Sequence, residues 1–187
     1  MTDSLDELAP LVRACTSCAL STTRTTVVVG DFPAQSRFLL VGEAPGAQED
    51  VAGRPFVGKA GALLDQLLSE VGLERDQVAV ANVIKCRPPD NRAPTRAEVR
   101  TCRGWLDRQV EIVDPPLVVT MGATALAWAL GPGRRLRDER GRIQPWNGRS
   151  LLVTYHPSAA IRFGPKGEPM AALREDLGMA AAATCAK

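Results

Sequence analysis

Four cysteines of this chain are spaced as metal ligands are. Cys15 and Cys18 form a Cys-x2-Cys pair near the N-terminus, and Cys86 and Cys102 follow in mid-chain. Thiolates are soft ligands that suit both zinc and iron–sulfur clusters. The spacing alone leaves three interpretations open: a four-iron cluster, a zinc ion, or no metal, with Cys102 packed as a small core residue. A fifth cysteine, Cys185, lies in an Ala-rich tail and is expected to be incidental.

A second group of residues could bind a polar ligand, because each follows a short apolar run. Gly42 and Glu43 follow Phe38-Leu39-Leu40-Val41, Asn82 ends a second run, and the only histidine, His156, follows a third. In a mostly parallel sheet the carboxyl ends of strands meet at one edge, where ligands bind. We therefore expect these side chains to converge. Taken singly, a lone histidine is more often a core or surface residue, and a strand-end asparagine can simply cap a turn.

The elements that must position these residues alternate between strands and helices. Apolar runs predict strands at 37–41, 78–81, 117–119 and 151–154, and helical spacing predicts helices at 4–14, 63–71, 95–114, 122–130 and 168–183. The segments 42–61 and 134–149 are predicted as a Gly/Pro-rich loop and as an arginine-rich loop or hairpin. This alternation predicts an α/β fold: a three-layer sandwich with a central, mostly parallel, four-stranded sheet flanked by helices. We expect residues 1–187 to form one domain.

The helix that carries Cys102 has the clearest local signals. Thr95 and Glu98 are spaced as a capping box, and Pro115 follows the predicted end of the helix. An apolar stripe then runs along one face, made of Val99, Cys102, Leu106, Val110 and Val113. We therefore expect Cys102 to face the core.

The composition excludes some classes of protein. The 187 residues carry a net charge of only +2, and no apolar run is long enough to span a bilayer. The acidic N-terminus lacks the features of a signal peptide, so a cytoplasmic protein without membrane contact is expected. One segment is rich in arginine, which favours phosphate, although a solvated charged loop is an equal alternative: it holds Arg134, Arg135, Arg137, Arg140, Arg142 and Arg149.

Three segments resemble the signatures of the family 4, iron–sulfur uracil-DNA glycosylases. Residues 42–50 and 53–61 resemble the first signature, residues 82–89 with Asn91, Arg92 and Pro94 the second, and residues 155–158 followed by Arg162 the third. The resemblance covers about residues 12–165. It implies an enzyme of DNA repair that flips uracil out of DNA and hydrolyses its N-glycosidic bond, leaving an abasic site.

The resemblance also implies a cofactor. Family 4 carries a [4Fe–4S] cluster, which here would be held by Cys15, Cys18, Cys86 and Cys102, in the segments 15–18 and 86–102. We expect this cluster to brace the DNA-binding loops, since hydrolysis needs no electron transfer, with a redox role in damage sensing as the alternative.

Roles for the pocket residues follow from the resemblance and from the chemistry of the reaction. His156 is expected to stabilise the departing uracil anion at O2, and Asn82 to pair with N3–H and O4. Phe56 resembles the family's stacking residue, and Glu49 would lie near uracil C5 and crowd the methyl group of thymine. Their alternatives are ordinary core packing and an exposed loop charge, respectively.

Two further residues are expected to line the pocket, Gly42 and Glu43. Better-known uracil glycosylases carry a water-orienting aspartate two residues after the equivalent of Gly42, where this chain has Ala44. Glu43 is therefore our candidate for activating water.

Uracil-containing DNA, single- or double-stranded, is the expected partner of a monomer, with a sliding clamp or another repair protein as a further candidate. The expected phosphate contacts are Lys85, Arg87, Arg92, Ser158 and Arg162. Ile161 or Arg162 could instead fill the space left by the flipped base.

Three other functions remain as alternatives: a catalytically silent uracil-DNA-binding module, a covalent one, and a zinc-stabilised nucleotide-binding protein. The covalent members of the superfamily use an extra histidine in the loop after the residue equivalent to Asn82. No histidine stands there in this chain, which disfavours covalent binding.

Overall fold

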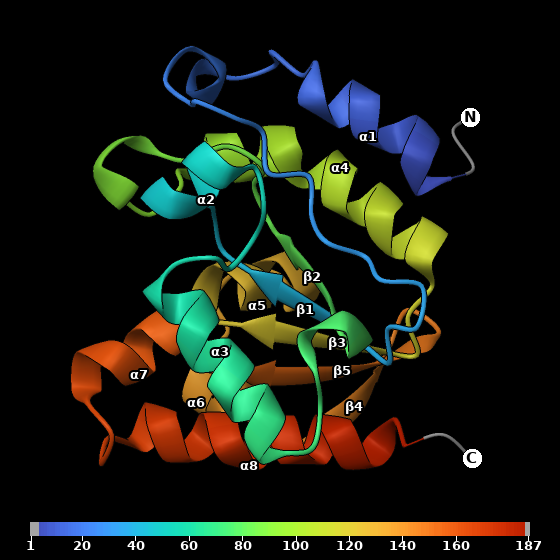
Figure 1. The fold of residues 1–187 in the computed structure, drawn as a ribbon, viewed down its shortest axis with the longest axis vertical. Coiled ribbons are helices and arrows are strands. Elements are labelled where there is room, and N and C mark those ends of the chain that lie inside the picture. The colour runs from blue at the N-terminus through green and yellow to red at the C-terminus, as the bar shows by residue number, and fades with distance from the viewer. Residues whose placement is uncertain (1–3, 186–187) are drawn as a thin grey trace.

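A five-stranded sheet lies at the centre of the computed structural model, which describes residues 4–185 (Figure 1). The strand order is β2-β1-β3-β5-β4, and the first four of these strands are parallel. The strands are β1 (Leu39–Gly42), β2 (Ala79–Asn82), β3 (Leu117–Met121), β4 (Ile143–Trp146) and β5 (Arg149–Thr154). The predicted α/β class and mostly parallel sheet are thus confirmed.

The fifth strand corrects the prediction of four. β4 forms in the arginine-rich segment and pairs antiparallel with β5 at the edge of the sheet. The two strands are joined by Asn147 and Gly148, both of which have positive φ (47° and 78°), as tight hairpin turns require. The strand was predicted only as part of a possible hairpin, because it has four residues, one of them Pro145, and its buried side alternates only weakly.

Helices cover both faces of the sheet (Figure 1). One layer contains α1 (Leu5–Arg13), α4 (Arg96–Val113) and α5 (Ala123–Leu130), and the other contains α3 (Lys59–Glu70), α7 (Pro157–Phe163) and α8 (Glu168–Ala183). Successive strand residues point to opposite layers, as the pleat dictates. Leu39 and Val41 of β1 pack in the first layer, and Leu40 packs in the second.

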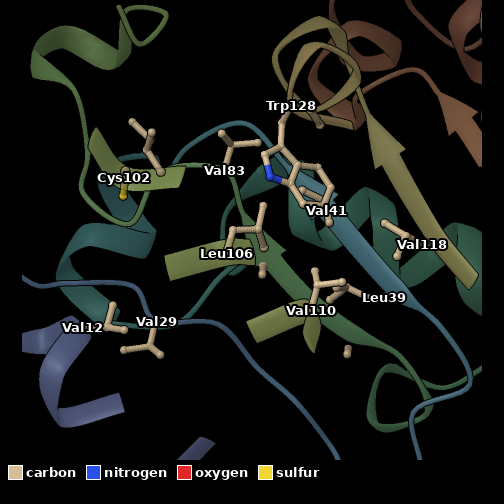
Figure 2. Packing of buried hydrophobic residues seen from close by; sticks show 14 of the residues in the cluster. Val12, Val29, Leu39, Val41, Val83, Cys102, Leu106, Val110, Val118 and Trp128 are labelled. Carbon is tan, nitrogen blue, oxygen red and sulfur yellow. The ribbon is translucent and has the colours of Figure 1, made fainter. Parts of the chain in front are cut away.

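The capping box of α4 forms as predicted. The Glu98 amide donates to Thr95 Oγ1 (3.2 Å), and the Thr95 amide donates to the Glu98 carboxylate (2.7 Å). Cys102 is 9% exposed and lies on the inner face of the helix with Leu106 and Val110 (Figure 2). Cys102 therefore belongs to the core while its sulfur remains at the edge of that core.

Three short α-helices were not predicted. α2 (Ala47–Ala52) lies within the segment predicted as a loop, and α7 starts directly after His156. A further short helix, α6 (Leu136–Glu139), precedes β4. Within residues 4–185, no helix is long and apolar enough to cross a membrane.

Candidate active site and four-cysteine site

A pocket of about 240 Å³ opens at the carboxyl ends of β1, β2 and β5. Seven of the candidate site residues predicted from the sequence line it, namely Glu43, Glu49, Phe56, Asn82, Arg92, His156 and Ser158. Gly42 lies directly behind two of them. Arg162 does not line the pocket. The parallel strands thus bring together residues that lie more than a hundred positions apart in the chain.

Asn82 forms the buried end of the pocket. Its side chain is 2% exposed, and its Oδ1 has no hydrogen-bond partner. A β-carbon on Gly42 would lie 2.5 Å from this oxygen and 2.8 Å from Cζ of Phe56, so only glycine fits between the two side chains. An unpaired acceptor in such a place is costly unless a ligand donates to it.

Phe56 forms a wall of the pocket in a strained backbone conformation. Its φ is 54°, which a bulky residue rarely adopts. Gly61 permits the arrangement, because a β-carbon there would overlap the Phe56 carbonyl. The Phe56 ring lies 5.6 Å from the His156 ring, centroid to centroid, at an angle of 34°. Strain of this kind persists where the surrounding structure enforces it, often at functional sites.

His156 is held in one tautomer by α7, whose first turn it caps. The Ser158 amide donates to His156 Nδ1 (3.2 Å), and Ser158 Oγ lies 2.8 Å from the same nitrogen. Because an amide can only donate, Nδ1 is the acceptor and Nε2 carries the proton. Burial lowers the pKa of His156 to about 4, with the charge of Glu49 acting in the opposite direction. The imidazole is therefore neutral at neutral pH and offers Nε2–H as a donor.

Glu49 holds the pocket loop together through its carboxylate. One oxygen accepts from the amides of Val57 (2.9 Å) and Gly58 (2.8 Å), and the other accepts from the amide of Gly46 (3.1 Å). Glu49 is thus not an exposed loop charge. Both of its oxygens bind the backbone, so it shapes the pocket wall that includes Phe56.

Glu43 accepts a short hydrogen bond from Thr124 Oγ1, at the start of α5. The sequence analysis missed Thr124. Its only signal was its place three residues after β3, at the same edge of the sheet as the other strand ends. The hydroxyl fixes the orientation of the Glu43 carboxylate at the pocket mouth.

The prediction that Lys85 contacts phosphate is wrong. Lys85 is 1% exposed, and its Nζ donates to the Asn82 carbonyl (2.8 Å) and to Gln109 Oε1 (2.6 Å). Burial lowers the pKa of this ammonium to about 8, and the neighbouring Cys102 opposes that shift. Lys85 directly follows two buried apolar residues, Val83 and Ile84, and this was the signal that it points inward.

The remaining cationic candidates lie at or near the surface. Arg92 lines the pocket and forms a bidentate ion pair with Glu98 (2.7 and 2.9 Å), and Arg87 donates to Asn91 (2.8 Å). Arg162 lies over the ring of Phe163, 5.8 Å from its centroid. Phe163 is 65% exposed, so α7 presents both a cation and an apolar ring to solvent.

The arginine-rich segment is largely neutralised by its own ion pairs. Glu139 bonds to Arg134 and Arg142, and Asp176 bonds to Arg140. Arg149 bonds to Asp114. These pairs favour a structural role for the segment over phosphate binding.

Cys15, Cys18, Cys86 and Cys102 line one small pocket beneath α1 and α4. Three of the sulfurs accept N–H donors: Cys15 from the Trp105 indole (3.3 Å), Cys86 from the Arg24 guanidinium (3.2 Å) and Cys102 from the Lys85 amide (3.3 Å). Such donors suit anionic thiolates. Burial raises the pKa of Cys102 to about 11, so binding a metal there must displace a proton.

Within residues 4–185, no three histidine, cysteine or acidic side chains are grouped closely enough to hold one metal ion.

Comparison with known proteins gives the class of this chain. A family model described as the uracil DNA glycosylase superfamily matches residues 29–178. The chain therefore belongs to the uracil-DNA glycosylase superfamily, as the sequence motifs predicted.

The relatives narrow the assignment. The chain is 45% identical over 153 residues to a type-4 uracil-DNA glycosylase of Thermotoga maritima, a match that covers 81% of this chain and 80% of the relative. It is 41% identical over 168 residues to a type-4 uracil-DNA glycosylase of Sulfurisphaera tokodaii, with 85% and 76% covered. A type-5 uracil-DNA glycosylase of Mycobacterium leprae is 31% identical over 154 residues, with 69% and 66% covered. Within the superfamily, this chain groups with the type-4 enzymes.

Proposed function

We propose that this chain excises uracil from DNA by hydrolysing the bond between N1 of the base and C1′ of the sugar. The observation that carries the assignment of the site is the buried Oδ1 of Asn82, which lacks a partner at the end of a base-sized pocket. Uracil N3–H supplies the missing donor, and the amide nitrogen of Asn82 donates to uracil O4. Cytosine has an acceptor at N3 and a donor at C4, so one fixed orientation of the amide rejects it.

The other pocket residues act on the flipped base. The Phe56 ring stacks on the base, and Glu49 holds the loop that presents this ring. We place Glu49 near uracil C5, where the wall that it braces has no room for the methyl group of thymine. Gly42 leaves room for the side chains of Asn82 and Phe56, because a β-carbon there would press on both.

Bond cleavage moves the electron pair of the C1′–N1 bond onto uracil, where the charge spreads to O2. His156 donates Nε2–H to O2, a contact that strengthens as the negative charge develops. A neutral donor is suited to this task because it stabilises the anion without having to lose a proton. A water oxygen then bonds to C1′, and Glu43, oriented by Thr124, takes the water proton.

The four cysteines fit a [4Fe–4S] cluster better than a zinc ion. The support is their shared pocket, the N–H donors to three sulfurs, and the similarity of the chain to type-4 uracil-DNA glycosylases, whose motifs it carries. When bound, the cluster adds negative charge and ties 15–18 to 86–102. DNA binds around the pocket mouth. Its phosphates contact Arg87, and Ser158 and Arg162 of α7.

A single-turnover assay on oligonucleotides with one uracil tests this function. Single-stranded and duplex substrates are incubated with protein purified without oxygen, and abasic sites are cleaved with alkali. We expect strand cleavage with the wild type and a rate roughly 10²- to 10³-fold lower with His156→Ala, the scale of losing one oxyanion donor. Affinity for DNA should change little, because the charge is absent in the ground state. Binding without cleavage by the wild type would favour the catalytically silent module.

A further inference from the structure

Lys85 is buried between the two sites described above and belongs to neither mechanism. It lines the cysteine pocket, and its backbone amide donates to Cys102 Sγ (3.3 Å). Its ammonium donates to the carbonyl of Asn82, three residues earlier in the sequence (2.8 Å). The residue that would read uracil is therefore bonded directly to a residue that lines the cysteine site.

The ammonium has no carboxylate partner. Its two acceptors are neutral, the Asn82 carbonyl and Gln109 Oε1 (2.6 Å), and no ion pair with Lys85 occurs among residues 4–185. A fully buried cation without a counter-charge is costly. The thiolates of a metal-loaded cysteine site are the negative charges that this location offers, and Lys85 lies on the wall of that site.

Gln109 makes the arrangement rigid. Its Oε1 accepts from Lys85, and its Nε2 donates to the carbonyl of Val29 (2.8 Å), while the Val28 amide donates to the Lys85 carbonyl (2.9 Å). Gln109 is fully buried on α4, the helix that carries Cys102. One network thus joins the end of β2, the helix that carries Cys102 and the segment that follows the first cysteine pair. Figure 2 shows Val29, Val83 and Cys102 within one hydrophobic cluster.

We propose that Lys85 is a positioning residue: its ammonium, balanced by the thiolates of the four-cysteine site, fixes the backbone of Asn82 so that the side-chain amide meets the uracil edge. This inference rests on the proposed function. Through Lys85, the cysteine site would influence the recognition of the base without any redox chemistry. Loss of the cluster would remove the counter-charge of Lys85 and loosen Asn82.

The test is a double-mutant cycle on single-turnover uracil excision with Lys85→Met, Asn82→Ala and the double variant. Methionine is an unbranched apolar side chain only one atom shorter than lysine, and it donates no hydrogen bond. We expect Lys85→Met to lower the rate roughly 10- to 100-fold, the scale for residues that orient a site through another group. If Lys85 acts through Asn82, the double variant should match Asn82→Ala within roughly twofold. Affinity for DNA without uracil should stay at the wild-type value.

Lys166→Met is the matched control, since Lys166 is exposed in the loop between α7 and α8, and it should retain the wild-type rate. Iron and labile sulfide are measured on every variant. If Lys85→Met loses its cluster or does not fold, Gln109→Met decides, because it removes one acceptor of the ammonium from outside the cysteine pocket. It should slow excision and give no further loss in the Asn82→Ala background.

A wild-type rate for cluster-loaded Lys85→Met, or losses that multiply in the double variant, would overturn the inference while leaving the proposed function intact. Where Gln109→Met decides, the same two results overturn it. A wild type that releases no uracil would instead overturn the proposed function.

Discussion

Gly42 and Asn82 are opposite one another in the register of β1 and β2, and a β-carbon on Gly42 would lie 2.5 Å from Asn82 Oδ1. The two residues therefore share one space at the end of the pocket. The absence of a side chain on Gly42 leaves room for the amide of Asn82. This pair connects the backbone geometry of the sheet with the recognition of a base edge.

Gly42→Ala should abolish most uracil excision without unfolding the protein. The added methyl group would press on Asn82 and on Phe56 Cζ, 2.8 Å away, and would tilt both away from the base. We expect a loss of at least roughly tenfold in the single-turnover rate, as for other residues that orient a site. Ala62→Gly, at an exposed position of α3 that does not line the pocket, is a control of similar size. A fully active Gly42→Ala would show that Asn82 does not meet the base in this orientation.

Asn82→Asp tests how the base edge is read. A carboxylate accepts from uracil N3–H but cannot donate to O4, whereas it could accept from the amino group of cytosine. We expect uracil excision to be lost, with at most a trace of cytosine excision, in assays on otherwise identical oligonucleotides. Retention of full activity on uracil would contradict the assigned role.

The depressed pKa of His156 predicts how stability depends on pH. The unfolded histidine takes up a proton near pH 6.5, but the folded one does so only near pH 4. Between these values the unfolded state binds more protons, so stability should fall as the pH is lowered from 6.5 to 4, by at most about 3 kcal/mol. Urea unfolding at several pH values measures this fall, which His156→Gln should reduce. Because His156 is the only histidine, an equal fall in the variant would assign the effect elsewhere.

The metal content should be four irons and four sulfides per chain, with a brown colour. Cys102→Ser should lose the cluster and solubility together, since that residue also packs in the core with Leu106. Cys185→Ser is the control and should keep its colour, because Cys185 is exposed and lies outside the cysteine pocket. Zinc without labile sulfide would contradict the cluster.

Arg162→Ala should make DNA affinity less sensitive to salt. A phosphate contact releases counterions with a slope of roughly 0.7 to 0.9 per contact, so its loss should flatten the slope by about one unit. Arg137→Ala is a suitable control, because Arg137 is paired with Asp138 on α6. An unchanged slope for Arg162→Ala would assign α7 to filling the space behind the flipped base, a task for which Ile161 and Phe163 are also exposed.

Local signals predicted most of the fold. We could predict three features because each depends on nearby residues: the capping box of Thr95 and Glu98, the apolar stripe through Cys102, and the four parallel strands. β4 was predicted only as part of one of two alternatives, a loop or a hairpin over 134–149, because its four residues include Pro145, although Asn147-Gly148 is a local hairpin signal. The convergence of Asn82 and His156 followed from the rule for parallel strands, but their hydrogen bonds did not.

Lys85 and Thr124 show where reasoning from sequence fails. A lysine within a DNA-binding motif is predicted to contact phosphate. Only the packing of the core shows that the Lys85 ammonium is buried and bonded to Gln109. Thr124 carries no local pattern, and its contact with Glu43 spans 81 positions. Both depend on long-range packing, which periodicity and caps do not encode.

The edge strand β4 has a consequence for how the protein behaves in a crowded solution. Pro145 is opposite Ser150, whose amide is directed to Pro116 on the far side of β5. The Pro145 nitrogen therefore faces outward, where an ordinary residue would offer an amide to a passing chain. A short edge that lacks this donor is a poor template for further strands. Replacing Pro145 would add an outward-facing amide to β4, and we expect this to increase aggregation.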